Sequence, residues 1–174
     1  MKILIRDIDK NIGNNRTERE KEAVRTLVAE AFGPQAIKNN LPSGEPIISI
    51  GGIPVDEAYS ITHCADVAVL VVNDGSAPLG VDAEQYRDQL RRVVHKFLSP
   101  EESAFYSSDE ALLTAWTLKE ATYKAAHTPG LALVDIHLPL NNESLIITAK
   151  DRKFRILESR YIRCNVMMSA VVGV

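Results

Sequence analysis

The chain has 174 residues, enough for one domain or for two tightly fused halves. With 45% hydrophobic and 25% charged residues it has the composition of an ordinary globular protein, and its net charge of −3 argues against a nucleic-acid binder that relies on overall positive charge. The apolar runs are too short for a membrane span or a signal peptide. Two cysteines without metal or disulfide spacing fit a reducing compartment, so we expect a cytoplasmic protein with no membrane partner.

In chain order, the first part of the sequence predicts one helix among short strands. Thr17 is the expected helix cap, with Glu20 completing a capping box, and Gly33-Pro34 ends the helical spacing that reaches Phe32. The β-branched run up to Asn73 predicts a buried strand. The expected strands are 3–8, 47–50 and 65–73, the last reached by a turn after 59–63, and the expected loops are 9–15 and 39–46.

The second part predicts two helices and a run of strands. After a turn at 74–76, the next strand covers 79–84. An amphipathic helix at 90–97 is closed by Ser99-Pro100, and a longer helix starts at Ser108 or Asp109 and runs to about Ala126. The remaining sequence alternates like a meander, with strands expected at 133–138, 144–149, 154–159 and 164–172, and Cys164 in the core.

These elements mix without the regular strand-helix-strand alternation of a parallel sheet. We therefore predict an α+β fold with mainly antiparallel sheets. Residues 1–78 and 79–174 each offer a helix that can pack on strands, so we expect two similar halves, related by a pseudo-two-fold axis, within one compact unit. The sequence itself contains no visible internal repeat.

Two short stretches carry most of the chemical information. Asp82 and Glu84 alternate along a predicted strand and therefore point to the same side. Glu120 and Lys124 are four residues apart and share one face of the long predicted helix. Three carboxylates and one ammonium group brought together suit a hard divalent cation, such as Mg²⁺, next to a phosphate.

Five patterns occur in a fixed order along the chain. They are Asn15-Arg16-Thr17, Gly44-Glu45-Pro46, Ser60-Ile61-Thr62-His63, Gly80-Val81-Asp82-Ala83-Glu84, and Trp116 to Lys124, which reads Trp-x-x-Lys-Glu-Ala-x-x-Lys. From about Arg16 to the C-terminus, this order resembles the 4′-phosphopantetheinyl transferases of the surfactin-synthetase-activating type.

The resemblance implies an enzyme that moves the phosphopantetheine arm of coenzyme A to a serine of an apo acyl or peptidyl carrier protein and releases 3′,5′-ADP. It implies that Asp82, Glu84 and Glu120 hold Mg²⁺, or Mn²⁺, on the pyrophosphate. Lys124 would contact the same phosphates, and Lys119 would add to that positive field. Glu120, or a water bound to the metal, would take the proton of the attacking serine, so the expected catalytic residues are Asp82, Glu120 and Lys124.

The resemblance also implies which residues bind the coenzyme. Arg16 and His63 would lie along it, toward its 3′-phosphate, together with Ser60 from the same turn. Gly44 and Pro46 would shape the adenine side, where a residue without bulk lets the backbone approach the ring. We expect this site in a cleft between the halves of a monomer.

Two features depart from the family pattern. Glu45 replaces the usual basic residue, and the segment before Arg16 is shorter than the one that carries further lysines, leaving Lys10, Arg19 and Arg25 as substitutes. They favour one alternative, a weak or inactive relative that still binds coenzyme A or a carrier protein. Another alternative is the shorter holo-acyl-carrier-protein synthase type, which works as a trimer and carries its Gly-x-Asp strand near the N-terminus.

Overall fold

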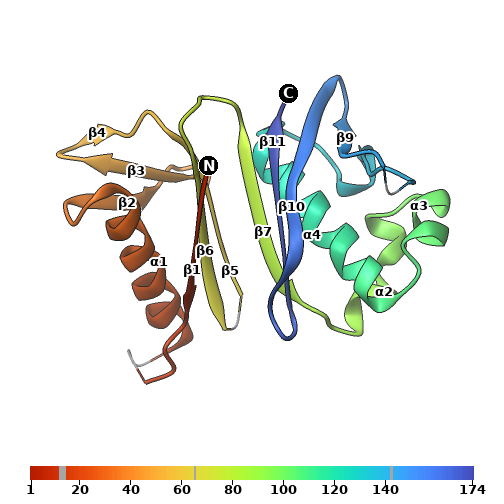
Figure 1. The fold of residues 1–174 in the computed structure, drawn as a ribbon, viewed down its shortest axis with the longest axis horizontal. Helices are drawn as coiled ribbons and strands as arrows, with labels where there is room; N and C mark the ends of the chain where they lie inside the picture. Colours follow the sequence, from red (N-terminus) through yellow and green to blue (C-terminus); the bar gives the residue numbers. More distant parts are fainter. Residues whose placement is uncertain (12–14, 65, 142) are drawn as a thin grey trace. The chain divides into compact units, whose positions relative to one another are not determined.

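The computed structural model describes residues 1–11, 15–64, 66–141 and 143–174 (Figure 1). The chain divides into two compact units, Met1–Ser76 and Ala77–Val174. The architecture is α+β with antiparallel sheets, as the sequence predicts. No helix among the described residues is long and apolar enough to cross a bilayer.

Unit 1 packs one long helix on an antiparallel sheet. The sheet has the order β1-β6-β5, with β1 at Lys2–Asp7, β5 at Ala58–His63 and β6 at Val67–Asn73. Helix α1, Arg16–Phe32, buries Val24, Leu27 and Val28 against this sheet because they recur at helical spacing. A second small sheet comprises β2 (Ala36–Asn40), β3 (Pro46–Ile50) and β4 (Ile53–Pro54).

The start of α1 differs from the prediction. Asn15 caps the helix, its Oδ1 accepting from the backbone N–H of Glu18 at 3.0 Å, so the expected cap at Thr17 and its capping box with Glu20 are wrong. Either residue type can cap, and the side chain two residues earlier takes the position. Residues 12–14 of the predicted loop 9–15, and residue 65 at the start of the predicted strand 65–73, lie outside the described residues. Strand β2 was not predicted.

Unit 2 contains a five-stranded antiparallel sheet in the order β7-β11-β10-β9-β8. Helix α4, Asp109–Ala126, lies against β7, β11 and β10 (Figure 1). The predicted start of this helix is confirmed, since Ser108 Oγ accepts from the N–H of Ala111 at 3.1 Å. The strands are β7 Leu79–Gln85, β8 Ile136–His137, β9 Ile146–Ala149, β10 Arg152–Arg163 and β11 Val166–Gly173.

Three predictions in unit 2 need correction. The expected helix 90–97 is split into α2, Gln89–Arg92, and a 3₁₀ turn η1, Val94–Lys96, at the adjacent β-branched residues Val93 and Val94. Ser99-Pro100 does not close that helix but opens another, α3, Pro100–Phe105, through a capping box with Glu102. The expected strand 133–138 is a 3₁₀ turn η2, Leu133–Asp135, followed by the short β8.

Cys164, expected in the core, is exposed. It lies in the turn that joins β10 and β11, because β11 begins only at Val166.

Helix α4 approaches the sheet of unit 2 closely at Gly80 of β7. A Cβ atom at this position would lie 1.9 Å from the carbonyl oxygen of Ala121 and 3.0 Å from the Cβ of Ala125. Helix α4 therefore rests directly on the backbone of β7, and only a residue without a side chain allows this contact. Asp82 and Glu84, two and four residues further along β7, point to the same side as Gly80 and thus toward α4.

Gly80→Ala should therefore destabilise the protein by about 1–3 kcal/mol, because the helix must move away from the strand. Urea unfolding measures this loss. Gly173→Ala is the matched control, since Gly173 lies in the neighbouring strand and its nearest contact is a Pro78 side-chain atom at 3.1 Å. A loss at Gly80 no larger than that at Gly173 would contradict the packing described here.

Candidate active site

The acidic residues singled out by the sequence lie together where α4 crosses β7. Asp82 is buried in the strand, and Glu84 and Glu120 are half-buried. Lys124, one turn after Glu120, reaches the strand: its Nζ donates to Asp82 Oδ1 at 2.7 Å and to the carbonyl oxygen of Val81 at 3.1 Å. The structure thus places the other two predicted carboxylates and the predicted ammonium group within electrostatic range of Glu120.

A second cation, Arg87, lies at the edge of this cluster. Its Nη2 donates to Glu84 Oε2 at 2.9 Å, and the arginine side chain is 61% exposed. An ion pair this exposed contributes about 0–1 kcal/mol and is easily exchanged for another partner. Lys124 and Arg87 therefore offset part of the negative charge that three carboxylates bring to this end of β7.

The carboxylates act on one another electrostatically. Burial raises the pKa of Glu120, the negative charge of Asp82 raises this pKa further, Lys124 lowers it, and Glu84 adds a smaller rise. The net effect is a raised pKa, so the ionised form of Glu120 loses more by burial and repulsion than it gains from Lys124. Such a group binds a proton more strongly than an isolated carboxylate does.

The oxygen atoms of these three carboxylates are ligands of the type that a hard divalent cation prefers. Mg²⁺ and Mn²⁺ favour carboxylate oxygens, and a divalent cation would relieve the repulsion that raises the pKa of Glu120. Over the part of the chain that the structure describes, no three His, Cys, Asp or Glu side chains form a group that could hold a metal ion. Ligation would require the carboxylates to draw together and Asp82 to exchange its contact with Lys124.

Lys119, expected on the phosphates, is placed elsewhere. Its side chain is fully buried, and its Nζ donates to Glu102 Oε2 at 2.7 Å and to the carbonyl oxygens of Leu133 and Ile136. These three contacts match the three donors of an ammonium group. The assignment of Lys119 to a phosphate is therefore corrected: it holds parts of unit 2 together.

In unit 1, Arg16 and His63 converge on a carboxylate. Arg16 Nε donates to Glu20 Oε1 at 2.6 Å, and His63 Nδ1 lies 3.6 Å from Glu20 Oε2. Arg16 is the first residue of α1 and His63 the last residue of β5, so the fold brings together two residues that the sequence separates by almost fifty positions. The side chains of Arg16 and His63 are 66% and 44% exposed, whereas that of Glu20 is 13% exposed.

The other predicted coenzyme contacts do not all gather near His63. Ser60 is buried and, by strand alternation, points to the opposite face of β5 from His63. Gly44 has a φ of +88° in the turn before β3, where glycine is favoured. Pro46 starts β3, and its carbonyl oxygen accepts from the hydroxyl of Tyr59, which belongs to the same strand as His63.

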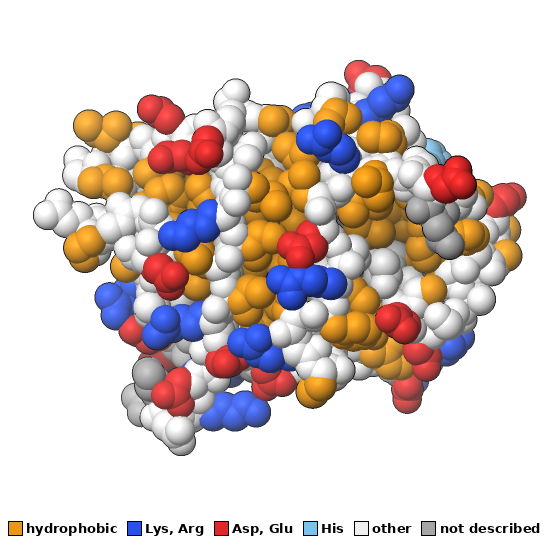
Figure 2. Space-filling model, in the orientation of Figure 1, with side chains coloured by type: hydrophobic (Ala, Val, Ile, Leu, Met, Phe, Trp, Pro, Cys, Tyr) orange, Lys and Arg blue, Asp and Glu red, His pale blue; other side chains and the backbone are white. Residues whose placement is uncertain are grey.

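Three residues of these clusters were not assigned such roles from the sequence: Glu20, Arg87 and Glu102. Glu20 and Arg16 are four apart on a helix, a spacing that predicts an ion pair. Arg87 was not singled out from the sequence. No local pattern points to Glu102, because it meets Lys119 across 17 residues of chain. On the face shown in Figure 2, the described lysines and arginines are interspersed with aspartates and glutamates and form no continuous basic stripe.

Comparison with protein families identifies a match in the second half of the chain. Residues 78–165, half of the chain, match the family model described as the 4′-phosphopantetheinyl transferase superfamily. This range includes β7 with its two carboxylates and the whole of α4. No curated protein matches the chain.

Glu120→Gln should raise the melting temperature of the protein at neutral pH in the absence of divalent cations. The folded-state pKa of Glu120 is raised, so above the ordinary carboxyl pKa the folded state binds protons more strongly than the unfolded state, and stability falls as the pH rises through the raised value. Removing the charge removes this loss.

The difference between Glu120→Gln and wild type should vanish below the ordinary carboxyl pKa, where Glu120 is protonated in both states. Thermal unfolding across this pH range measures the effect. Glu110→Gln, an exposed change on the same helix, is the control and should give no gain. A melting temperature that falls with Glu120→Gln at neutral pH would contradict the electrostatics described.

Proposed function

The chain belongs to the 4′-phosphopantetheinyl transferase superfamily, and from this premise we propose that it transfers the 4′-phosphopantetheine arm of coenzyme A to a serine of an apo carrier protein. The observation that carries the proposal is the meeting of Asp82 and Glu84 on β7 with Glu120 and Lys124 on α4, inside the matched residues. Carboxylates and an ammonium group in this combination suit a pyrophosphate with a divalent cation.

The proposed reaction is a displacement at phosphorus. The serine oxygen of the carrier forms a bond to the phosphorus atom that bears the pantetheine arm. The bond from this phosphorus to the bridging oxygen breaks, and 3′,5′-ADP leaves with that oxygen. Glu120, or a water at the cation site, would accept the serine proton as the general base.

Asp82, Glu84 and Glu120 would hold Mg²⁺. When bound, this ion would supply positive charge that offsets the negative charge developing on the leaving phosphate. Lys124, now on Asp82, would exchange this contact for a phosphate oxygen as a compact cation. Arg87 would release Glu84 at little cost, since the pair is exposed.

Arg16 and His63 would bind the 3′-phosphate of the coenzyme. Their convergence on Glu20 supports this, because two side chains that meet around one carboxylate have the spacing to meet around another anion. Gly44 and Pro46 would lie on the adenine side. We propose that the protein acts as a monomer; a stable trimer in light scattering would instead favour the shorter holo-acyl-carrier-protein synthase type.

A second candidate function is binding without efficient transfer. Glu20 favours it, since this carboxylate lies at the proposed phosphate contact and repels an anionic ligand. Glu45, exposed in the turn before β3, adds another negative charge to unit 1. In this case the protein would bind coenzyme A or a carrier protein, and the carrier would gain no mass.

Incubation of the protein with apo carrier proteins, coenzyme A and Mg²⁺ should add the mass of the phosphopantetheine arm to a carrier, and chelation of the metal should abolish the gain. Asp82→Asn and Glu120→Gln should each lower kcat by about 10²–10⁴-fold, because they remove charge from the proposed cation and proton site. Mass spectrometry of the carrier measures both effects. Glu110→Gln is the control, and full activity of either site variant would overturn the assigned roles.

Glu20→Gln should lower the Kd for 3′,5′-ADP about two- to five-fold, because it removes a competing carboxylate from Arg16 and His63. Calorimetric titration measures the change. Glu30→Gln, an exposed change on the same helix, is the matched control and should leave the Kd unchanged. Weaker binding after Glu20→Gln would show that the carboxylate supports the ligand instead of competing with it.

A further inference from the structure

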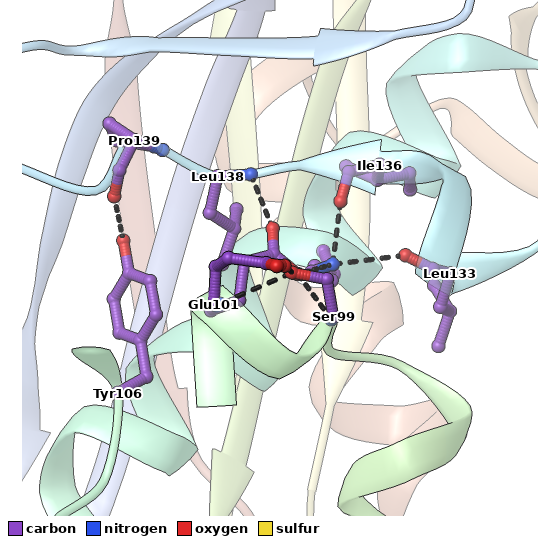
Figure 3. Close-up of polar contacts among 9 residues, drawn as sticks. Ser99, Glu101, Tyr106, Leu133, Ile136, Leu138 and Pro139 are labelled. Carbon is purple, nitrogen blue, oxygen red and sulfur yellow. Dashed lines mark hydrogen bonds and ion pairs between the residues drawn. The ribbon is translucent and has the colours of Figure 1, made fainter. Parts of the chain in front are cut away.

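Unit 2 contains a buried ion pair that the proposed reaction does not use. Lys119 of α4 has an exposure of 0% and Glu102 of α3 one of 3%. Lys119 Nζ lies 2.7 Å from Glu102 Oε2, 2.6 Å from the carbonyl oxygen of Ile136 and 3.2 Å from that of Leu133. Figure 3 labels the two carbonyl partners, Leu133 just before β8 and Ile136 at its first position.

The carboxylate of Glu102 is equally well satisfied. Its Oε2 also accepts from the N–H of Ser99 at 3.0 Å, and its Oε1 accepts from the N–H of Leu138 at 2.7 Å. One ion pair thus connects α4 with the start of α3 and with both sides of β8. Tyr106 extends the connection outside this pair, since its hydroxyl donates to the carbonyl oxygen of Pro139 at 2.7 Å (Figure 3).

Stability alone is a weak reason for this arrangement. Removing two charges from water is unfavourable, and an apolar pair of similar volume is often as stable as a buried ion pair. Burial lowers the pKa of Lys119, and the hydrogen bond to the Glu102 carboxylate opposes that change. The pair instead fixes the orientation of the elements that it joins, because each of its five hydrogen bonds has a defined geometry.

The ion pair of Lys119 also affects the orientation of Glu120, the next residue of α4. Lys119 immediately precedes Glu120, and neighbouring residues of an α-helix project about 100° apart. Lys119 fixes the helix to α3 and to the segment 133–138, while the Ala121 carbonyl fixes it to Gly80 of β7. These two attachments flank Glu120 in sequence, so together they set the rotation of the helix and the direction of the Glu120 side chain.

We propose that Lys119 and Glu102 are positioning residues for the transfer reaction, which hold α4 in the rotation that directs Glu120 toward Asp82 and Glu84. The proposal rests on the proposed function. Neither residue touches the substrates. Because a displacement of about 1 Å in a reacting group costs about 10²-fold in rate, a helix held less firmly would lower turnover without loss of the fold.

The test compares wild type with Lys119→Met/Glu102→Leu, which replaces the ion pair by two apolar side chains. Single variants leave one buried charge without its partner and are expected to unfold more easily, so the double variant is the informative one. Its melting temperature should fall by several degrees, because four backbone groups lose their side-chain partners, so kcat is compared at a temperature at which both proteins are folded. Its kcat should fall about 10–100-fold while the KM values for coenzyme A and carrier change less than about three-fold.

Mn²⁺ binding, followed by electron paramagnetic resonance, gives a readout that needs no turnover. The double variant should bind Mn²⁺ about 10–100-fold more weakly, because Glu120 is no longer directed toward Asp82 and Glu84. Tyr106→Phe is the matched control: it removes one part-buried hydrogen bond at the end of α3 that does not involve α4, and it should leave kcat and Mn²⁺ affinity unchanged.

The outcomes separate the inference from the proposed function. A folded double variant with the kcat and Mn²⁺ affinity of wild type overturns the positioning role while the transferase function stands. Wild type that transfers no arm, but whose Mn²⁺ affinity falls in the double variant, overturns the function and supports the positioning role. Wild type that neither transfers the arm nor binds Mn²⁺ overturns both.

Discussion

The direct contact of α4 with the backbone of β7 is the constraint on which the rest of unit 2 depends. Gly80 allows it, because any Cβ at this position would overlap the carbonyl oxygen of Ala121. The contact lies two residues before Asp82 and one residue after Glu120, so the carboxylates of strand and helix are brought within electrostatic range of one another. A bulkier residue would separate the helix from the strand and the charges with it.

The charged groups at this contact are poorly matched in number, and this imbalance has a chemical use. Three carboxylates share Lys124 and the exposed Arg87, and burial of Glu120, together with the repulsion from its acidic neighbours, raises the pKa of Glu120. Lys119, only one residue from Glu120, is in contrast fully buried with Glu102. Adjacent residues of one helix thus differ in their surroundings: Lys119 is fully buried in its ion pair, and Glu120 is half-buried next to Asp82 and Glu84.

Much of the unit 2 site was predictable from local sequence. Asp82 and Glu84 follow strand alternation, Glu120 and Lys124 follow helix spacing, and Ser108 marks the helix start that the structure confirms. These predictions depend on residues a few positions apart. The membership of the chain in the 4′-phosphopantetheinyl transferase superfamily agrees with the resemblance carried by the same motifs, while the surfactin-synthetase-activating subtype stays a prediction.

The errors arose where residues distant in sequence decide the outcome. Lys119 was assigned to a phosphate because Glu120 and Lys124 of the same motif were assigned to the phosphate site. Its actual partner, Glu102, lies on α3. That helix was missed because its start at Ser99-Pro100 was interpreted as the end of another helix. Glu20 was assigned to a capping box, yet tertiary packing places it between Arg16 and His63. Ser60 is a different case: strand alternation places it on the other face of β5 from His63, and its assignment to the coenzyme stays a prediction.

The most direct measurement is the anomalous diffraction of manganese in crystals of the protein grown with Mn²⁺ and coenzyme A. We expect one strong peak among the carboxylates of Asp82, Glu84 and Glu120, with Lys124 moved from Asp82 to a phosphate oxygen. A peak elsewhere, or bound coenzyme with no metal at these three side chains, would contradict the central claim that β7 and α4 together form a cation site for the pyrophosphate.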